Sequence, residues 1–237
     1  MRVVMFDKFF HDFYFGIVEK EGYKLILEGL GNTLFISLCA LIIGAVLGTV
    51  VAIVKISKSK NVFMVLLKLL CSLYTTIIRG TPILVQLLLA HFAIFPAIYK
   101  NAPIVLTAII VFGINSGAYV SEVIRSGILA VDKGQTEAGR TLGLSSFKTM
   151  RLIVLPQAIK NILPALGNEF IALIKETSIV AYIGIRDLTR AAQQITGKTY
   201  EFFAPYITVS IVYLMIVIGL TQLLGLFERR LRKSDNR

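Results

Sequence analysis

Long uncharged segments are the feature that most constrains how this chain can fold. Four segments contain no Asp, Glu, Lys or Arg over 20 to 26 residues, and they cover residues 29–54, 80–99, 101–121 and 202–227. A helix of about 20 apolar residues crosses the hydrocarbon core of a bilayer. A soluble domain with 56% apolar and only 16% charged residues would leave too much apolar surface in water. The chain is therefore predicted to be an all-α integral membrane protein.

Two less uniform segments decide the number of spans. Residues 61–78 are apolar apart from Lys68 and lead into Arg-Gly-Thr-Pro at 79–82, so we interpret 61–95 as one long bent element. Residues from about 155 to 183 form a polar-interrupted span with four charged side chains, Lys160, Glu169, Lys175 and Glu176. With the remaining uncharged segments, this gives five spans.

The distribution of Lys and Arg predicts the orientation. With five spans, the loop at 55–60, residues 122–160 and the tail after Phe227 share one side. They carry three, six and five Lys or Arg residues, 14 in all, against eight on the other side. Cytoplasmic segments carry the excess of these residues, so the N-terminus is predicted outside and the C-terminus inside. Six spans would place the three lysines of the 55–60 loop outside, which fits the rule less well.

Several function classes are disfavoured by the composition. The net charge of +11 follows from the topology, since basic segments after a span meet anionic headgroups, and nucleic acid is not the expected partner. Cys39 and Cys71 lie in apolar runs, so neither a disulfide framework nor a cysteine zinc site is indicated. His11 and His91 are too few for a His-rich metal site. No metal site, catalytic residue or cleavable signal peptide is expected.

The two ends of the chain flank a central domain at residues 25–230. Residues 1–24 are predicted to be extracytoplasmic, and residues 231–237 form a basic cytoplasmic tail. The N-terminal segment places four phenylalanines at near-helical spacing, Phe6, Phe9, Phe10 and Phe13. An interfacial amphipathic helix and an aromatic-rich start to the first span are both open interpretations.

Two Gly-xxx-Gly pairs fall inside predicted spans, Gly44 with Gly48 and Gly113 with Gly117. Small residues at this spacing let helix backbones approach closely. Packing within one subunit is the favoured interpretation, and a dedicated dimer seam is the alternative.

The loop at 126–156 is the most informative segment on the predicted inside. Glu137, Ala138 and Gly139 put an acidic group and two very small residues on a short predicted helix, which Gly143 is suited to end. An exposed helix with so little side-chain bulk suits insertion into a groove on another protein. The turn that follows is expected to be packed by three apolar residues, Phe147, Ile153 and Leu155.

The spacing of these residues resembles the coupling loop of bacterial ABC-importer permeases, in which Glu-Ala-Ala, three residues and Gly precede a hydrophobic run ending in Leu-Pro, here at 155–156. Over about residues 25–230, further segments are similar to the branch of that family that imports histidine, glutamine, arginine or cystine. These segments are RGTPILVQ at 79–86, AYVSEVIRSGI at 118–128 and NEFIALIKETS at 168–178. Gly139 departs from the usual Ala. It preserves small size but gives up about 1 kcal/mol of helix propensity, which is expected to make the helix less rigid.

The resemblance implies a five-span type I ABC importer transmembrane domain with a division of labour. Two permease subunits, identical or homologous, form the path in the bacterial inner membrane. An extracytoplasmic binding protein delivers a polar amino acid, and two cytoplasmic ATPases drive transport. ATP and Mg²⁺ then belong to the partner ATPase, and this chain binds no cofactor. The helix at 134–146 is implied to couple to the ATPase through five residues, Glu137, Ala138, Gly139, Leu142 and Gly143.

ATP hydrolysis by this chain itself is not expected. Residues 197–199 read Gly-Lys-Thr, the tail of a phosphate-binding loop, but Ala192 stands where the first glycine belongs. The segment follows no predicted strand and is interpreted as a solvated loop on the outside.

Arg79 is the main candidate for the transport path, because ionisable residues at membrane depth are costly and usually functional. A guanidinium binds a carboxylate through two hydrogen bonds, and every α-amino acid carries that carboxylate. Arg79 is therefore hypothesised to line the path with Thr81 and Gln86. The alternative is an Arg79 that lies at an interface or forms a structural ion pair.

The polar residues of the fourth span have two interpretations. Asn168, Glu169 and Lys175 either border an aqueous route through a partly unwound helix or form a structural polar network at the subunit seam. Glu122 and Arg125, three residues apart, are predicted to form an ion pair on a helix surface.

Two other function classes remain as alternatives. A membrane enzyme would need a cluster of catalytic side chains at one interface, which the sequence does not contain. A channel or an ion-gradient-driven carrier would need no ATPase-docking loop. Which amino acid is carried is left open.

Overall fold

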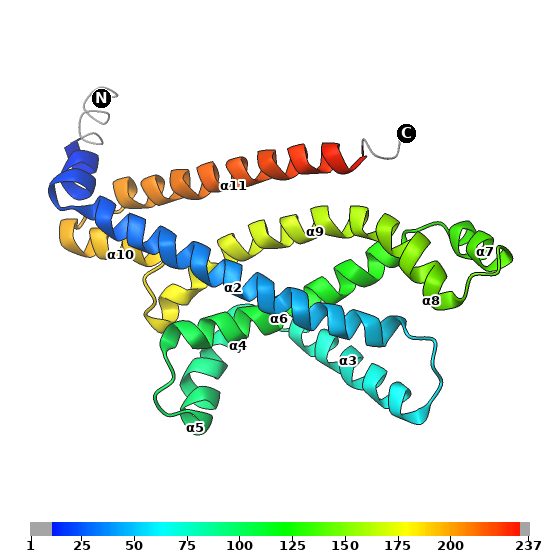
Figure 1. Ribbon diagram of the computed structural model, residues 1–237. Coiled ribbons are helices and arrows are strands. Elements are labelled where there is room, and N and C mark those ends of the chain that lie inside the picture. Colours follow the sequence, from blue (N-terminus) through cyan, green and yellow to red (C-terminus); the bar gives the residue numbers. More distant parts are fainter. Residues whose placement is uncertain (1–10, 233–237) are drawn as a thin grey trace.

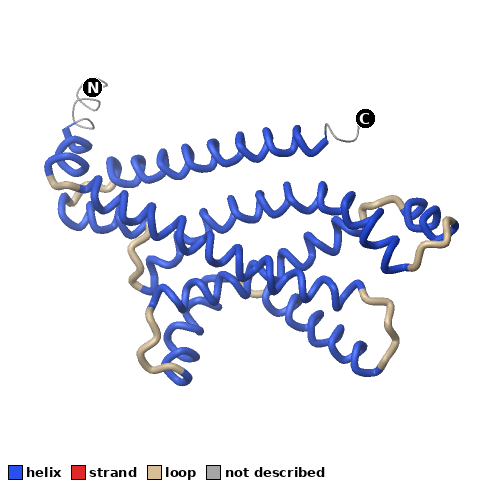
Figure 2. Tube along the Cα trace, viewed as in Figure 1, coloured by secondary structure: helices blue, strands red, loops and turns tan. Residues whose placement is uncertain are grey.

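Long helices that run between two ends of the molecule organise the computed structural model, which describes residues 11–232 (Figure 1). Figure 2 shows these helices joined by short connections, with no strand among the described residues. Four helical segments are long and apolar enough to cross a membrane, Gly22–Ile56, Val62–Gly80, Ile104–Leu129 and Phe203–Arg230. The prediction of an all-α membrane protein is confirmed.

The elements follow one another with few interruptions. The longer helices are α2 (Gly22–Ile56), α3 (Val62–Gly80), α6 (Ile104–Leu129), α9 (Leu155–Glu176), α10 (Leu188–Thr199) and α11 (Phe203–Arg232). The shorter ones are α4 (Ile83–Leu89), α5 (Phe95–Ile98), α7 (Lys133–Thr141) and α8 (Ser146–Thr149). Tighter or wider helical turns lie between them: the π-helical turns η1 (Tyr14–Glu19), η2 (Ala90–Ile94) and η3 (Met150–Val154), and the 3₁₀ turn η4 (Thr177–Ile183).

The segment predicted as one bent element is a single pass made of successive helices. α3 stops at Thr81, whose extended backbone (φ −122°, ψ 145°) is the conformation favoured before Pro82. α4, η2 and α5 then continue toward the end of the molecule opposite the start of α3 (Figure 1). The five passes are therefore α2, α3 to α5, α6, α9 with η4, and α11.

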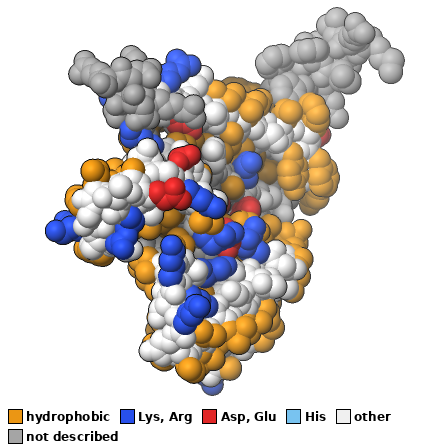
Figure 3. All heavy atoms as spheres, turned by 90° about the vertical axis from the view of Figure 1, so that its right-hand side faces the viewer, with side chains coloured by type: hydrophobic (Ala, Val, Ile, Leu, Met, Phe, Trp, Pro, Cys, Tyr) orange, Lys and Arg blue, Asp and Glu red, His pale blue; other side chains and the backbone are white. Residues whose placement is uncertain are grey.

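The loops lie at the two ends of the molecule in the two groups that the charges predict. Residues 57–61, 130–154 and 228–232 lie at one end, which we call the basic end, and η1, α10 and the turn after α5 lie at the other (Figure 1). Figure 3 views the molecule from the basic end and shows many Lys and Arg side chains there. The predicted grouping of these segments is confirmed.

Close contact between α2 and α6 forms the centre of the fold, and the four glycines of the two pairs make it possible. A Cβ on Gly44 would lie 2.6 Å from Oγ of Ser116, and a Cβ on Gly48 would lie 2.7 Å from Cγ1 of Val120. The glycines of α6 meet α2 in the same way, since a Cβ on Gly113 would lie 2.7 Å from Cγ2 of Ile43. The prediction of packing within one subunit is confirmed.

Two buried clusters surround this contact. The larger one joins α2, α4, η2, α6, α9 and η4 through eleven residues: Ile36, Ala40, Leu87, Ala90, Ala108, Val111, Phe112, Leu173, Val180, Ile183 and Ile185. The smaller one joins η1, α2, α10 and α11 through Ile17, Ile26, Leu188, Ala191, Ala192, Ile195 and Val209. The two clusters hold α9 and α10 against the central helices.

The interpretation of residues 197–199 as a solvated loop is only partly right. Gly197 and Lys198 are exposed, but these residues form the last turn of α10, whose apolar face is buried in the smaller cluster. Asp187 caps the helix through hydrogen bonds accepted from the N–H groups of Thr189 (3.0 Å) and Arg190 (2.8 Å). Asp187 is fully buried, and this burial raises the pKa of its carboxyl group. The apolar residues of α10 follow helical spacing, and this places them on the face that packs against α2 and α11.

Only part of the N-terminal aromatic segment lies within the described residues. Phe6, Phe9, Phe10 and residues 233–237 of the basic tail lie outside them. Phe13 packs against the smaller cluster beside the buried Ile17. The described part of residues 1–24 is therefore helical and joins the body of the protein.

Adding one methyl group at the α2–α6 contact tests this packing. Gly44→Ala is expected to lower the free energy of unfolding by about 1–3 kcal/mol, because the new Cβ has no space beside Ser116. Gly31→Ala is the matched control on the same helix, where a Cβ would meet nothing within 4 Å, and it is expected to be neutral or stabilising. Thermal unfolding of the purified protein in detergent compares them. Equal melting temperatures for the two variants would contradict the assignment.

Candidate functional site

α7 is a short helix at the basic end with a defined cap at each terminus. The side chain of Asp132 accepts a backbone N–H at the start of the helix (2.6 Å). At the other end the N–H of Gly143 donates to the carbonyl of Arg140 (3.0 Å), and the N–H of Leu144 donates to the carbonyl of Gly139 (3.1 Å). This pair of bonds is a Schellman motif, which requires the left-handed backbone that Gly143 adopts (φ 81°). Gly143 therefore ends the helix.

The inner face of α7 has no room for a side chain at Gly139. A Cβ there would lie 2.8 Å from Cγ2 of Thr149 and 2.9 Å from Cδ1 of Ile153. α7 thus rests directly on α8 and η3, and a hydrogen bond from Gln157 Nε2 to Gln135 Oε1 (3.1 Å) ties it to α9. The lost helix propensity of glycine is offset by this close contact between α7 and its support.

The outer face of α7 is exposed. Glu137 and Ala138 lie on it, and Leu142 follows at the C-terminus of the helix with 79% of its surface exposed. α7 therefore combines a fixed inner face with a free outer face.

The packing predicted for the turn after α7 is partly wrong. Phe147 is 72% exposed, and Leu155 is 38% exposed. The partly buried Ile153 does pack beside Gly139, as predicted, and the buried Thr149 takes the other place there. The reason is geometric: α8 is a single turn capped by Ser145, and this turn directs Thr149 inward and Phe147 outward. Phe147 thus adds apolar surface at the basic end.

Polar side chains satisfy the backbone carbonyls left by the break between α3 and α4. Thr81 Oγ1 donates to the carbonyl of Ile77 (2.8 Å), and Gln86 Nε2 donates to the carbonyl of Ile78 (2.8 Å). Unpaired carbonyls would be costly at membrane depth. Gln86 Oε1 also accepts a hydrogen bond from Nδ2 of Asn115 on α6 (3.1 Å). Thr81 and Gln86 therefore fix the junction against α6.

Arg79 lies just before this break, and its side chain is exposed. Its Cζ is 5.2 Å from the centre of the Tyr119 ring on α6, a cation–π distance. Within residues 11–230 no carboxylate pairs with it. The Tyr119 ring therefore orients the guanidinium of Arg79, and the N–H groups of the guanidinium remain available to a ligand.

The three candidate residues on α9 differ in exposure. Asn168 and Lys175 are exposed, whereas Glu169 is partly buried and lies against Ser116 of α6. α9 is a continuous α-helix to Glu176 and changes to a 3₁₀ turn only at Thr177. The partly unwound helix proposed for this stretch is not observed. The buried face of α9 packs well enough to keep it helical.

Three polar side chains of α6, which the sequence analysis did not single out, lie next to these groups. Asn115 donates to Gln86 and Tyr119 lies under Arg79, while the buried Ser116 lies near Glu169 without a hydrogen bond to its hydroxyl. A signal was present in the sequence, because adjacent Asn and Ser residues in an uncharged span need polar partners. α6 thus brings polar groups of α3, α4 and α9 to one stretch of helix.

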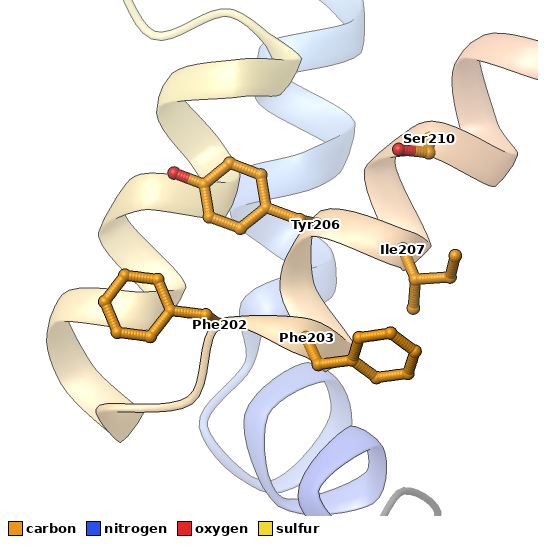
Figure 4. A pocket seen from close by; sticks show the side chains of 5 residues that line it. All are labelled: Phe202, Phe203, Tyr206, Ile207 and Ser210. Atoms are coloured by element: carbon orange, nitrogen blue, oxygen red, sulfur yellow. The ribbon is translucent and has the colours of Figure 1, made fainter.

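The hollow at the start of α11 has a different character. Figure 4 shows its lining, Phe202, Phe203, Tyr206, Ile207 and Ser210. Phe202 and Tyr206 point to one side of the helix, and Phe203 and Ile207 point to the other (Figure 4). Aromatic side chains at the end of a span are typical of the membrane–water interface. This hollow of about 430 Å³ offers no charged side chain to a polar solute.

Comparison with known proteins gives consistent matches. The family described as "Binding-protein-dependent transport system inner membrane component" matches residues 44–233. The putative glutamine transport system permease protein GlnP of Rickettsia bellii is 43% identical over 206 residues, which cover 87% of this chain and 92% of the relative. The arginine transport system permease protein ArtQ of Bacillus subtilis is 40% identical over 210 residues, which cover 89% and 94%.

Solved structures resemble the chain over nearly its whole length. An amino acid ABC transporter crystallised with histidines has a TM-score of 0.83 and 44% identity, with 90% of this chain and 97% of the other covered. The MetNI methionine ABC transporter in an inward-facing conformation has a TM-score of 0.75 at 18% identity, covering 88% and 97%. The second similarity concerns the fold alone.

A double substitution tests the contact beneath α7. Gly139→Ala is expected to strain the helix against Thr149 and Ile153, and Thr149→Ser, which removes the nearer clashing methyl, is expected to relieve part of the strain. The two changes should therefore be non-additive by about 1 kcal/mol. Amide hydrogen exchange of residues 133–154 measures this. Thr208→Ser on α11 is the control for the second change. If the effects of Gly139→Ala add to those of Thr149→Ser as simply as to those of Thr208→Ser, the contact between Gly139 and Thr149 is contradicted.

Proposed function

The chain belongs to the family of binding-protein-dependent transport system inner membrane components, and we propose that α7 couples it to a separate ATPase. Its relatives identify it as a permease subunit of an amino acid ABC transporter. The observation that carries the coupling proposal is α7 itself, a capped helix with a free outer face at the end of the spans. A carrier driven by an ion gradient would have no use for such a helix.

The contacts of α7 suit it to transmit force. Its inner face touches η3 at Gly139, and Gln135 is bonded to Gln157 on α9. A displacement of α7 would therefore act on α9 and, through Glu169, on the polar stretch of α6. When two ATPases close on ATP, the coupling helices of two permease subunits would be drawn together and the permease would rock from inward-open to outward-open.

The proposed partners follow from this mechanism. A second permease subunit, identical or homologous, completes the path, and an extracytoplasmic binding protein delivers the amino acid. ATP and Mg²⁺ are held by the ATPase, and this chain holds no cofactor. Within the described residues, no group of three or more His, Cys, Asp or Glu side chains is placed to hold a metal ion.

The proposed orientation puts the basic end in the cytoplasm of a bacterial cell. The excess of Lys and Arg at that end supports it, because such residues are retained on the cytoplasmic side. The N-terminus then lies outside, and α7 lies on the side where ATP is available.

The proposed path for the amino acid runs along the polar stretch of α6. Arg79 supports this proposal because its guanidinium has no carboxylate partner in residues 11–230 and can bind the α-carboxylate of the substrate. Thr81 and Gln86 hold the neighbouring junction. Glu169 offers a carboxylate to the α-amino group, while Asn168 and Lys175 are exposed candidates on the same helix.

Reversing the charge on α7 tests the coupling. Glu137→Lys is expected to abolish co-purification of the ATPase with the permease, because the outer face would present a cation where an acidic group docks. Glu19→Lys, an exposed change of the same kind at the opposite end, is the control and should retain the ATPase. Retention by both variants, with correct membrane insertion, would contradict the proposal.

Removing the guanidinium tests the substrate path. Arg79→Ala is expected to reduce amino acid uptake in proteoliposomes at least about tenfold, since a charge-assisted hydrogen bond contributes about 1.5–3 kcal/mol. Arg79→Lys keeps the charge but loses the two-point contact and should show an intermediate rate. ATPase co-purification verifies assembly. Unchanged uptake by Arg79→Ala would remove Arg79 from the path.

A further inference from the structure

A charged cavity lies between α2, α3 and α6 near the basic end. It is open to the surface, has a volume of about 290 Å³, and is lined by Lys55, Lys68, Ser72, Glu122 and Arg125. This is ample space for several waters or one polar headgroup, since a water occupies about 30 Å³ of liquid. The cavity is separate from both α7 and the polar stretch of α6.

The cavity carries an excess of positive charge. The predicted ion pair is confirmed, because Arg125 Nε lies 2.9 Å from Oε2 of Glu122. Lys55 Nζ binds the other carboxylate oxygen at 2.5 Å. Glu122 is thus fully occupied, and three cations face one anion, which leaves two positive charges without a counter-ion in the cavity.

Several hydrogen-bond donors around the cavity remain available. Arg125 donates to Glu122 through Nε, which leaves its two terminal nitrogens free in the described part of the chain. Lys68 donates to the carbonyl of Ser59 (3.1 Å) and has two further N–H groups. Ser72 also lines the cavity and adds a hydroxyl group. Among the lining residues only Glu122 is acidic, and it is already paired with Lys55 and Arg125.

We propose that this cavity binds a phosphate group, supplied by the headgroup of an anionic phospholipid. Terminal guanidinium nitrogens, ammonium groups and a hydroxyl form the donor set that phosphate oxygens prefer. Basic pockets between spans at this depth are suited to lipid headgroups. The inference depends on the chain lying in a bilayer and not on coupling to an ATPase.

The surface of α3 beside the cavity supports a lipid as the source. Val65, Leu69 and Leu73 are each more than half exposed and recur every four residues, so they form one apolar stripe on a helix whose other sides also expose apolar residues such as Leu66 and Leu70. Lys68 and Ser72 precede two of them in the chain and line the cavity. A lipid whose acyl chains follow this apolar stripe places its phosphate beside the cations.

Lipid titration of the purified, full-length chain in its transporter complex tests the site. The probes are short-chain phosphatidylglycerol, short-chain phosphatidylcholine and inorganic phosphate, and the readout is bound lipid by native mass spectrometry with the shift in melting temperature. Phosphatidylglycerol is expected to bind at least about tenfold more tightly than phosphatidylcholine. Lys68→Gln and Arg125→Gln should each weaken phosphatidylglycerol binding about tenfold, since each removes charge-assisted hydrogen bonds.

Lys58→Gln is the matched control, because Lys58 is an exposed cation of the adjacent loop that does not line the cavity. Lys58→Gln removes the same charge as Lys68→Gln does, and it should leave phosphatidylglycerol binding within twofold of that of the unaltered protein. Equal losses in Lys58→Gln and Lys68→Gln, or no preference for the anionic lipid, would overturn the proposal. If inorganic phosphate displaces bound phosphatidylglycerol as effectively as the lipid itself does, the cavity is a phosphate site but its ligand is free phosphate and not a lipid.

Discussion

The close approach of α2 and α6 is the interaction on which the rest of the structure depends. In a bilayer, apolar side chains gain little by leaving lipid for protein, so helix association relies on packing and on interhelical hydrogen bonds. The glycines of α2 and α6 allow this packing, because a Cβ on any of the four would meet the facing helix at less than 3 Å. With its backbone fixed in this way, α6 can present different side chains to α3, α4 and α9.

Two proposed sites lie along α6. Its middle brings Asn115, Ser116 and Tyr119 to the polar groups of the neighbouring helices. Its last turns hold Glu122 and Arg125 at the charged cavity. α7 follows α6 after a short connection and packs against η3. The proposed substrate path, the proposed lipid site and the proposed coupling helix are therefore linked through one rigid element.

Much of the architecture was predictable because hydrophobic length and charge act locally along the chain. The uncharged segments fixed the passes, and the Lys and Arg counts grouped the loops correctly. Gly143 was identified as the end of α7 because a left-handed backbone favours glycine. The errors have physical causes. An apolar side chain such as Phe147 is predicted inside, although the direction of one helical turn places it outside. Residues 197–199 are predicted to lie in a loop, although they end a helix whose apolar residues face a buried cluster.

The sequence by itself determined that this chain crosses a membrane, which loops share a side, and which short helix stands outside the spans. Each of these depends on residue type and spacing within a single segment. Only the tertiary structure decided that Gly139 of α7 faces α8 and η3, that Arg79 lies over the Tyr119 ring, and that Lys55 pairs with Glu122. These contacts join residues from different helices, and their geometry follows from how closely the glycines let the helices pack.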